Sequence, residues 1–213
     1  MNDQKKVLIF GLGNPEDKYA GTRHNIGFEV AYALGKRLEA TFKQERYGMV
    51  ARGKWKGRTI VIIMPTTYMN LSGNAVRYWI EQEKVTTQQI MVIADDIDLP
   101  VAQLRIRPKG GGGSHNGLNH IIEVLGNGNY PRLRFGIGKN YPIGYQVEYV
   151  LGKFEPEERP EIDKAVDRSV DICLSFATAG LQRTMNQYNQ KENKEKENKD
   201  NNNDNHVETS ATE

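Results

Sequence analysis

The first forty residues join a short apolar run, a glycine-rich connection and an amphipathic helix, and this combination limits the folds open to the chain. Residues 7–10 are four consecutive apolar residues, which is typical of a buried strand. Apolar side chains at 26, 30, 34 and 38 recur every four residues and predict a helix over about 22–40. The connection reads GLGNPEDKYAGTRHN. In open α/β sheets such crossovers lie at the carboxyl ends of strands, so a ligand site is expected there.

Turn chemistry explains only part of this connection. Gly11, Gly13 and Pro15 are ordinary turn residues. Arg23 and His24, which open the predicted helix, have no such explanation, and their placement points to a functional site. For Arg23 we expect a structural ion pair near the start of the helix.

The remaining sequence alternates between strand and helix patterns. Strands are predicted at 48–52, 58–64, 90–94, 102–107 and 133–138. Helices are predicted from Ser72, which could act as an N-cap, over 118–125 and over 162–177. The near-continuous apolar run 90–94 indicates a central strand. The alternation predicts one three-layer α/β/α domain over 1–188, with a mixed, largely parallel, twisted sheet.

Residues 189–213 differ in composition from the rest of the chain. They include no Phe, Trp or Tyr and almost nothing apolar, so they cannot offset the entropy of ordering and are predicted to form a disordered polar tail. Residues 191–213 contain four lysines and seven acidic residues, a net charge of −3, whereas the whole chain carries +2. The body is therefore mildly basic, which is compatible with a nucleic-acid partner.

The number of cysteines and the hydropathy of the chain indicate in which compartment the protein is expected. The single cysteine, Cys173, excludes an internal disulfide framework and falls on an apolar helix face, so we expect it in the core. No apolar run approaches the ~18 residues of a membrane-spanning helix. These features predict a cytoplasmic protein with no membrane partner.

Polar residues follow four of the predicted strands. They are Asn14 and His24, then Met69 and Asn70, then Asp95, Asp96 and Asp98, and finally a glycine loop with Ser114, His115 and Asn116. If most of the strands run parallel, the four loops meet at one edge of the sheet. The sequence therefore predicts a single site assembled from distant segments.

The residue types at this edge suit acid–base chemistry. His24 can act as a general base, and a helix N-terminus would favour its neutral form. Asp95 could bond the second ring nitrogen and stabilise the imidazolium. Asn14, Asn70 and Asn116 could hold water and a developing oxyanion. Taken singly, Asn14 could instead be a turn former and Asn116 a helix N-cap.

Other known motifs are not completed. The run 11–16 lacks the last glycine of a dinucleotide fingerprint, and no P-loop lysine follows. The acidic trio has no calcium-loop spacing, and His115 and His120 are five residues apart, so no metal site is predicted. Residues 112–116 resemble a nucleophile elbow but end in asparagine where glycine belongs. Although this motif is incomplete, a serine esterase that uses Ser114 or Ser72 is a further alternative.

A basic group accompanies the glycine loop. It comprises Arg105, Arg107, Lys109, Arg132 and Arg134, with each strand placing its two arginines on one face. The polyglycine segment lets backbone approach a ligand closely and leads into a helix N-terminus, an arrangement that suits phosphate. The alternative is a solvated strand face beside a flexible loop.

Six ordered motifs carry a resemblance. They are GLGNP, TRHN at 22–25, PTTYMNLSG at 65–73, DDIDLP at 95–100, GGSHNGL at 112–118 and RLRFGIG at 132–138. On these motifs the chain resembles bacterial peptidyl-tRNA hydrolase over about residues 5–188. Glu16 stands where that family usually has glycine, and Met64 stands where lysine is common. Neither departure touches the proposed base.

The resemblance implies a metal- and cofactor-independent monomer that hydrolyses the ester between a peptide and the tRNA 3′ ribose, which recycles tRNA for translation. It implies that His24 activates water and that Asp95 orients His24. Asn14 and Asn116 would contact the substrate, and Asn70 would help place His24 or the water. The remaining implied contacts are Tyr19 and Met69 lining the site and Arg107, Arg134, Arg105 and Lys109 binding phosphate near the tRNA acceptor end.

A second class of function stays open. Some chloroplast relatives on this fold are non-catalytic RNA-processing proteins that act through protein partners. Such a binding module would show no turnover in a hydrolysis assay, whereas the complete set of polar residues above predicts an enzyme.

Overall fold

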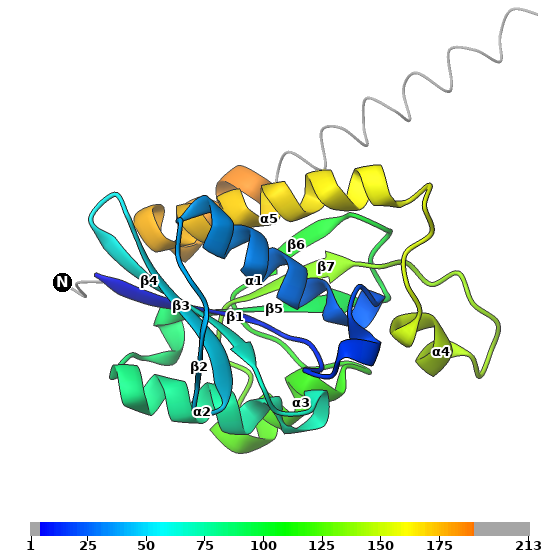
Figure 1. Cartoon of the computed structure of the whole chain (residues 1–213), viewed down its shortest axis with the longest axis horizontal. Helices are drawn as coiled ribbons and strands as arrows, with labels where there is room; N and C mark the ends of the chain where they lie inside the picture. Colours follow the sequence, from blue (N-terminus) through cyan, green and yellow to red (C-terminus); the bar gives the residue numbers. More distant parts are fainter. Residues whose placement is uncertain (1–4, 190–213) are drawn as a thin grey trace, which may run out of the picture.

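The computed structural model describes residues 5–189 and is built around one seven-stranded sheet (Figure 1). The order of the strands across the sheet is β2-β3-β4-β1-β5-β7-β6. Their bounds are Lys6–Gly11 (β1), Lys43–Glu45 (β2), Gly48–Trp55 (β3), Arg58–Pro65 (β4), Ile90–Asp96 (β5), Leu104–Arg107 (β6) and Arg132–Gly136 (β7).

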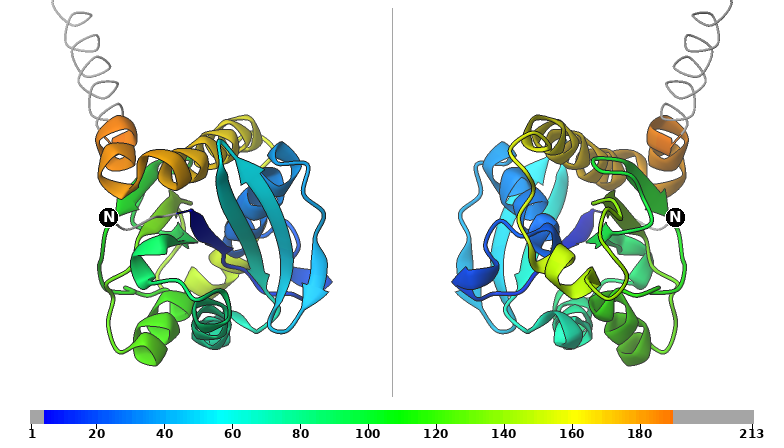
Figure 2. Two further views of the ribbon diagram at one scale, coloured as in Figure 1. Left: turned by 90° about the vertical axis from the view of Figure 1, so that its left-hand side faces the viewer. Right: turned by 90° about the vertical axis from the view of Figure 1, so that its right-hand side faces the viewer.

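Helices cover both faces of this sheet (Figure 2). The α-helices are Ile26–Arg37 (α1), Ser72–Glu83 (α2), Asn116–Leu125 (α3), Gln146–Leu151 (α4) and Arg159–Ala179 (α5), and residues 181–189 are also helical. One core lies between the sheet and the pair α1 and α5, and a second lies between the sheet and the pair α2 and α3. The predicted three-layer α/β/α architecture is confirmed.

The pairing of the strands decides where functional groups can meet. Strands β4, β1, β5 and β7 run parallel, while β3 and β6 pair antiparallel at the two sides. The sheet is therefore mixed and largely parallel, as predicted. The carboxyl ends of the four parallel strands lie at one edge, which we call the carboxyl edge.

The topology corrects the expected route of the glycine loop. Because β6 runs against β7, it ends at the edge opposite the carboxyl edge. The backbone nitrogen of Gly110 donates to the oxygen of Gly128 at that far edge. The chain then returns along 111–115, so that α3 begins at the carboxyl edge. The loop reaches the predicted place, but not by following a parallel strand.

A close approach of backbone to backbone sets the start of α1 over the sheet. A Cβ added to Gly27 would lie 2.4 Å from the Leu12 carbonyl oxygen and 2.7 Å from that of Ile93. A Cβ on Gly11 would lie 2.1 Å from the oxygen of Gly27. Only glycine permits this contact, which holds the first turn of α1 at the ends of β1 and β5.

Several local predictions need correction. The helix predicted over 22–40 begins only at Ile26, and Arg23–Asn25 forms a 3₁₀ turn before it. Ser72 is not an N-cap, because its hydroxyl donates back to the Met69 carbonyl. The strand β2 was not predicted, since Lys-Gln-Glu has no apolar pattern.

The end of the described chain also bears on the predicted tail. Asn189 is helical, and its side-chain amide exchanges hydrogen bonds of 3.1 Å with both backbone groups of Ile106 at the outer side of β6. The rest of the predicted tail, 190–213, lies outside the described residues. Cys173 is fully buried, as expected. Among residues 5–189, no helix combines the length and the apolar character needed to cross a bilayer.

Candidate active site

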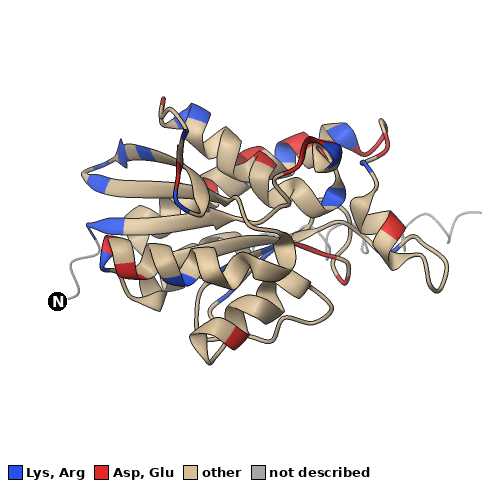
Figure 3. Ribbon diagram, turned by 60° about the horizontal axis from the view of Figure 1, so that its bottom comes forward, with Lys and Arg blue, Asp and Glu red and all other residues tan. Residues whose placement is uncertain are grey.

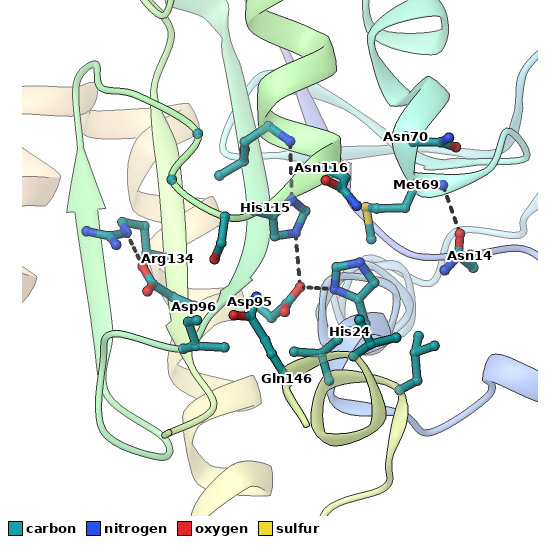
Figure 4. Close-up of a pocket in the computed structure, with 18 of the residues that line it drawn as sticks. Asn14, His24, Met69, Asn70, Asp95, Asp96, His115, Asn116, Arg134 and Gln146 are labelled. Atoms are coloured by element: carbon teal, nitrogen blue, oxygen red, sulfur yellow. Dashed lines mark hydrogen bonds and ion pairs between the residues drawn. The ribbon is translucent and has the colours of Figure 1, made fainter. Parts of the chain in front are cut away.

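A pocket opens at the carboxyl edge and gathers most of the predicted site residues (Figure 4). Those that line it are Asn14, Tyr19, His24, Met69, Asn70, Asp95, Asn116 and Arg134. Three predicted phosphate-binding residues do not line it: Arg105, Arg107 and Lys109. The four distant segments therefore do meet, as the sequence predicted.

His24 and Asp95 form the polar centre of the pocket. The Nδ1 atom of His24 lies 2.8 Å from Oδ1 of Asp95, and only 12% and 4% of the two side chains are exposed. Burial by itself would lower the pKa of His24, but the charge and hydrogen bond of Asp95 outweigh it and raise the pKa above the ordinary value. The net shift of the pKa is therefore opposite to the one that a helix dipole alone would give, because the neighbouring carboxylate dominates.

His115 is a second partner of Asp95 that the sequence analysis missed. Its Nε2 atom lies 3.0 Å from the same Oδ1 oxygen, and its Nδ1 atom accepts the backbone N–H of Leu118 at 3.2 Å. Because Nδ1 accepts, Nε2 must carry the proton and donate it to Asp95. His115, not Asn116, is thus the N-cap of α3.

The two histidines also settle the state of Asp95. Burial acts to raise the pKa of the Asp95 carboxyl, but His115 and His24 outweigh it and hold the pKa well below its usual range. The carboxylate is therefore ionised at neutral pH. It accepts from both rings, which leaves Nε2 of His24 as the ring nitrogen available to a substrate or water.

The same three residues have the composition of a metal site. Donor atoms of His24, Asp95 and His115 all lie within 4.8 Å of one another. A metal on Nε2 of His115 would need that nitrogen deprotonated, and a proton moved to Nδ1 would face the N–H of Leu118. The capping bond therefore favours a hydrogen-bonded network over a metal centre at this point.

Asn14 is fixed so that its amide nitrogen is the group left for a ligand. Its Oδ1 accepts the backbone N–H of Met69 at 2.8 Å. Its own backbone is held by Asn25, whose side chain accepts from Asn14 N at 2.9 Å and donates to Asn14 O at 3.0 Å. Asn25 is buried and was not singled out from the sequence, although it stands next to His24 in TRHN.

Asn70 and Asn116 differ from Asn14 in being free to bind. Both are exposed and line the pocket, one before α2 and one at the start of α3. Among the described residues, neither side-chain amide has a hydrogen-bond partner. Three amides thus line the same pocket as His24, and two of them can rotate to suit a ligand (Figure 4).

The basic group divides into three kinds of residue. Cross-strand register pairs Arg105 with Arg134 and Arg107 with Arg132, so all four arginines share one face. Arg134 forms an ion pair with Asp96 and reaches the pocket. Arg105 is half-buried and Arg107 is exposed, both outside the pocket.

Arg132 does not belong to the accessible face, contrary to the expectation. It is 2% exposed, stacks on Tyr130 at 4.1 Å and donates to the carbonyls of Gly111 and Gly128 at 2.9 and 3.0 Å. Its role is to hold the glycine loop.

The other basic residues near the glycine loop are candidates for binding phosphate. The lysines and arginines of the β3–β4 hairpin, by contrast, lie at the opposite end of the molecule from α4 (Figure 3).

The serine alternative loses one of its candidates. Ser72 is fully buried and does not line the pocket. Ser114 is exposed and lines the pocket, but among the described residues it has no hydrogen bond to a histidine. A nucleophilic serine needs a base within hydrogen-bond reach, so the geometry favours water as the nucleophile.

Comparisons with known proteins agree with the motifs. The family model for peptidyl-tRNA hydrolase matches residues 8–197. A peptidyl-tRNA hydrolase of Porphyromonas gingivalis is 48% identical over 184 residues, covering 86% of this chain and all of that protein. One from Parabacteroides distasonis is 48% identical over 186 residues, with 87% and 100% coverage. A crystal structure of the Acinetobacter baumannii peptidyl-tRNA hydrolase superposes with a TM-score of 0.82 at 32% identity, covering 89% of this chain and 97% of that one.

Proposed function

The chain belongs to the peptidyl-tRNA hydrolase family. On that premise we propose that His24 and Asp95 catalyse the hydrolysis of the ester between peptide and tRNA. The family match spans most of the chain, and the relatives are covered almost end to end. The observation that carries the proposal is the ionised Asp95, bonded to Nδ1 of His24 and leaving Nε2 free in the pocket.

The reaction begins with a water molecule at Nε2 of His24. As the water oxygen attacks the ester carbonyl carbon, Nε2 takes its proton and the ring becomes an imidazolium. The Asp95 carboxylate stabilises that charge without itself being protonated, since its pKa is held low. The carbonyl oxygen becomes an oxyanion, which the amide N–H groups of Asn14 and Asn116 can stabilise.

The intermediate then collapses. The bond from carbon to the ribose 3′ oxygen breaks, and the imidazolium of His24 returns its proton to that oxygen. The products are a tRNA with a free 3′ hydroxyl and a peptide carboxylic acid, which releases its remaining proton to solvent and becomes a carboxylate. Asn70 lies where it can hold the attacking water or the carbonyl before the reaction.

We assign the two ends of the substrate to two sides of the pocket. Arg134, with Arg107 and with Arg105 and Lys109 beside them, would bind phosphates of the acceptor end, next to the glycine loop. The peptide would lie on the apolar lining, which includes Tyr19, Met69 and the residues Val147, Val150 and Leu151 of α4.

The central experiment measures the turnover of a peptidyl-tRNA by wild-type protein and by His24→Ala. A general base contributes about 10²–10⁴-fold, so we expect a loss of at least about 100-fold. Turnover within tenfold of wild type would show that His24 is not the base. No turnover by the wild type would instead favour the non-catalytic RNA-binding alternative. Ser114→Ala serves as the control and should stay within about threefold, whereas a serine esterase would lose its activity.

The phosphate assignment has its own test. Replacing Arg107 and Arg134 together by Gln should raise KM and reduce the salt dependence of KM, since each lost phosphate contact releases about one counterion fewer. An unchanged salt slope would remove the assignment. Chains ending at residue 188 test whether 1–188 is the catalytic domain, and sedimentation tests the proposed monomer.

A further inference from the structure

Arg23 is a buried cation beside the proposed base, and it points away from the pocket. Its side chain is 6% exposed, and its NH2 group lies 2.9 Å from the Glu158 carboxylate. Its NH1 group donates to the carbonyl of Lys153. The guanidinium also stacks over the rings of Tyr149 and Phe154 at 4.3 and 5.2 Å. The expected structural ion pair is confirmed, and its partner lies immediately before α5.

Within residues 5–189, every partner of this side chain comes from one segment, 149–158. The backbone joins in the same contact, because the nitrogen of Arg23 donates to the oxygen of Gly152 at 2.9 Å. Thr22 forms an isolated antiparallel bridge with Lys153. The segment from the end of α4 to the start of α5 is thus docked onto the two residues before His24.

The docking helps to hold helix α4, because this helix is only partly buried. It is six residues long and none of them is buried. Its second anchor is the hydroxyl of Tyr149, which donates to the carbonyl of Ile137 at 2.6 Å. Just before it, Ile143 is fully exposed and Tyr145 is 57% exposed. Tyr149 and Val150 pack against the core under α1 and α5, but both are only partly buried, so polar anchors add to what holds the helix in place.

This partly buried helix forms one wall of the pocket. Gln146, Val147, Val150 and Leu151 all line it, and Val147 is 63% exposed. Exposed apolar side chains continuous with the pocket offer a surface to the apolar side chains of a peptide. The position of α4 therefore decides how much of that surface a bound peptide can use.

We propose that Arg23 is a positioning residue that holds the α4 wall and thereby sets the affinity for peptides long enough to reach it. The proposal rests on the function proposed above. A planar guanidinium can bond Lys153 and Glu158 at once while it stacks on Tyr149, and a lysine ammonium cannot reproduce that fork. Loss of the fork loosens α4 and leaves the bonds of His24 to Asp95 unchanged.

The experiment compares two substrates on the same tRNA, an N-acetyl-aminoacyl-tRNA and a tetrapeptidyl-tRNA with apolar residues. For Arg23→Lys we expect KM for the tetrapeptidyl-tRNA to rise about tenfold, the strength of one charge-assisted hydrogen bond. KM for the acetyl substrate should change less than about threefold, and kcat for both should stay near wild type. Amides of 146–151 should exchange with solvent faster.

The matched control is Arg159→Gln, which removes the neighbouring ion pair to Glu29 on α1 and touches no residue of α4. It should leave both KM values unchanged. Val147→Ser alters the wall directly and should give the same length-dependent rise even if Arg23→Lys folds poorly.

Three results would overturn the proposal: equal changes in KM for both substrates, no change in either, or a loss of kcat with KM unchanged. The last would mean that Arg23 acts through His24. Failure of the proposed function is distinguishable, because wild type and Arg159→Gln would then turn over neither substrate.

Discussion

The proposed mechanism depends most directly on the charge of Asp95, and Asp95→Asn removes that charge with little change in shape. The amide oxygen can still accept from His24 and His115, so the ring orientation can survive. What is lost is the attraction between a carboxylate and the imidazolium that forms at the transition state. The variant therefore isolates the electrostatic part of the interaction.

The size of the effect follows from the geometry. The contact is short, at 2.8 Å, and the two side chains are only 12% and 4% exposed, so solvent screens it weakly. A hydrogen bond to a charged group contributes about 1.5–3 kcal/mol. Since each 1.36 kcal/mol is about tenfold in rate, kcat should fall roughly 10- to 150-fold, and the burial favours the upper half of that range.

The same reasoning predicts the direction in which the pH–activity profile should shift. In the wild type the pKa of His24 is raised, so activity should rise with pH through a value above the ordinary histidine value of about 6.5. Without the carboxylate the imidazolium is less stable and burial dominates. The acid limb of Asp95→Asn should therefore move to lower pH.

The assay is steady-state hydrolysis of one peptidyl-tRNA between about pH 5 and 9. Asp98→Asn is the control, because Asp98 also lines the pocket but is 64% exposed and contacts neither histidine. It should keep the wild-type profile. A loss below threefold in Asp95→Asn, or an acid limb that moves to higher pH, would refute the assigned role of the carboxylate.

Three further substitutions test other parts of the structure. His115→Asn keeps a capping side chain on α3 but cannot reach Asp95. The unfolding free energy should therefore change by under about 1 kcal/mol while turnover falls severalfold, and unchanged turnover would contradict the assigned role of His115. Gly27→Ala should destabilise the protein by about 3 kcal/mol or more in denaturant unfolding, because the new Cβ would meet the Leu12 carbonyl at 2.4 Å, and a neutral effect would disprove the close approach. Arg132→Met should cost about 2–4 kcal/mol in the same measurement, since two buried loop carbonyls lose their donor, and unchanged stability would show that the loop holds itself.

Most of the fold could be predicted because apolar patterns record burial. The runs in β1 and β5 are buried on both faces, and the spacing in α1 and α5 marks a single buried stripe. The direction of a strand could not be predicted in this way, because no residue pattern in β6 indicates that it pairs antiparallel with β7. That depends on how the whole sheet closes, and it is why the predicted route of the glycine loop was wrong.

The site was predictable where a residue has no structural reason to be present, and it was missed where a residue has two roles. His24 stood out for that reason, and Asp95 stood out because it follows the predicted central strand. His115 was passed over because its spacing to His120 suggested no metal, whereas its actual role combines a helix cap with a bond to Asp95. Arg132 looked like its exposed neighbours, because strand alternation alone cannot tell a solvated face from one covered by a loop.

The turn Arg23–Asn25 shows why so short a motif carries so much of the site. A 3₁₀ helix has three residues per turn, so consecutive side chains point about 120° apart. Arg23 accordingly reaches Glu158 at the start of α5, His24 reaches Asp95 in the pocket, and Asn25 reaches back to the backbone of Asn14. Asn25 occupies the N-cap position of α1 but makes no side-chain capping bond, because its amide is committed to Asn14. The three contacts share one rigid turn, so an insertion or deletion within it would misplace the base, one wall and one amide at the same time.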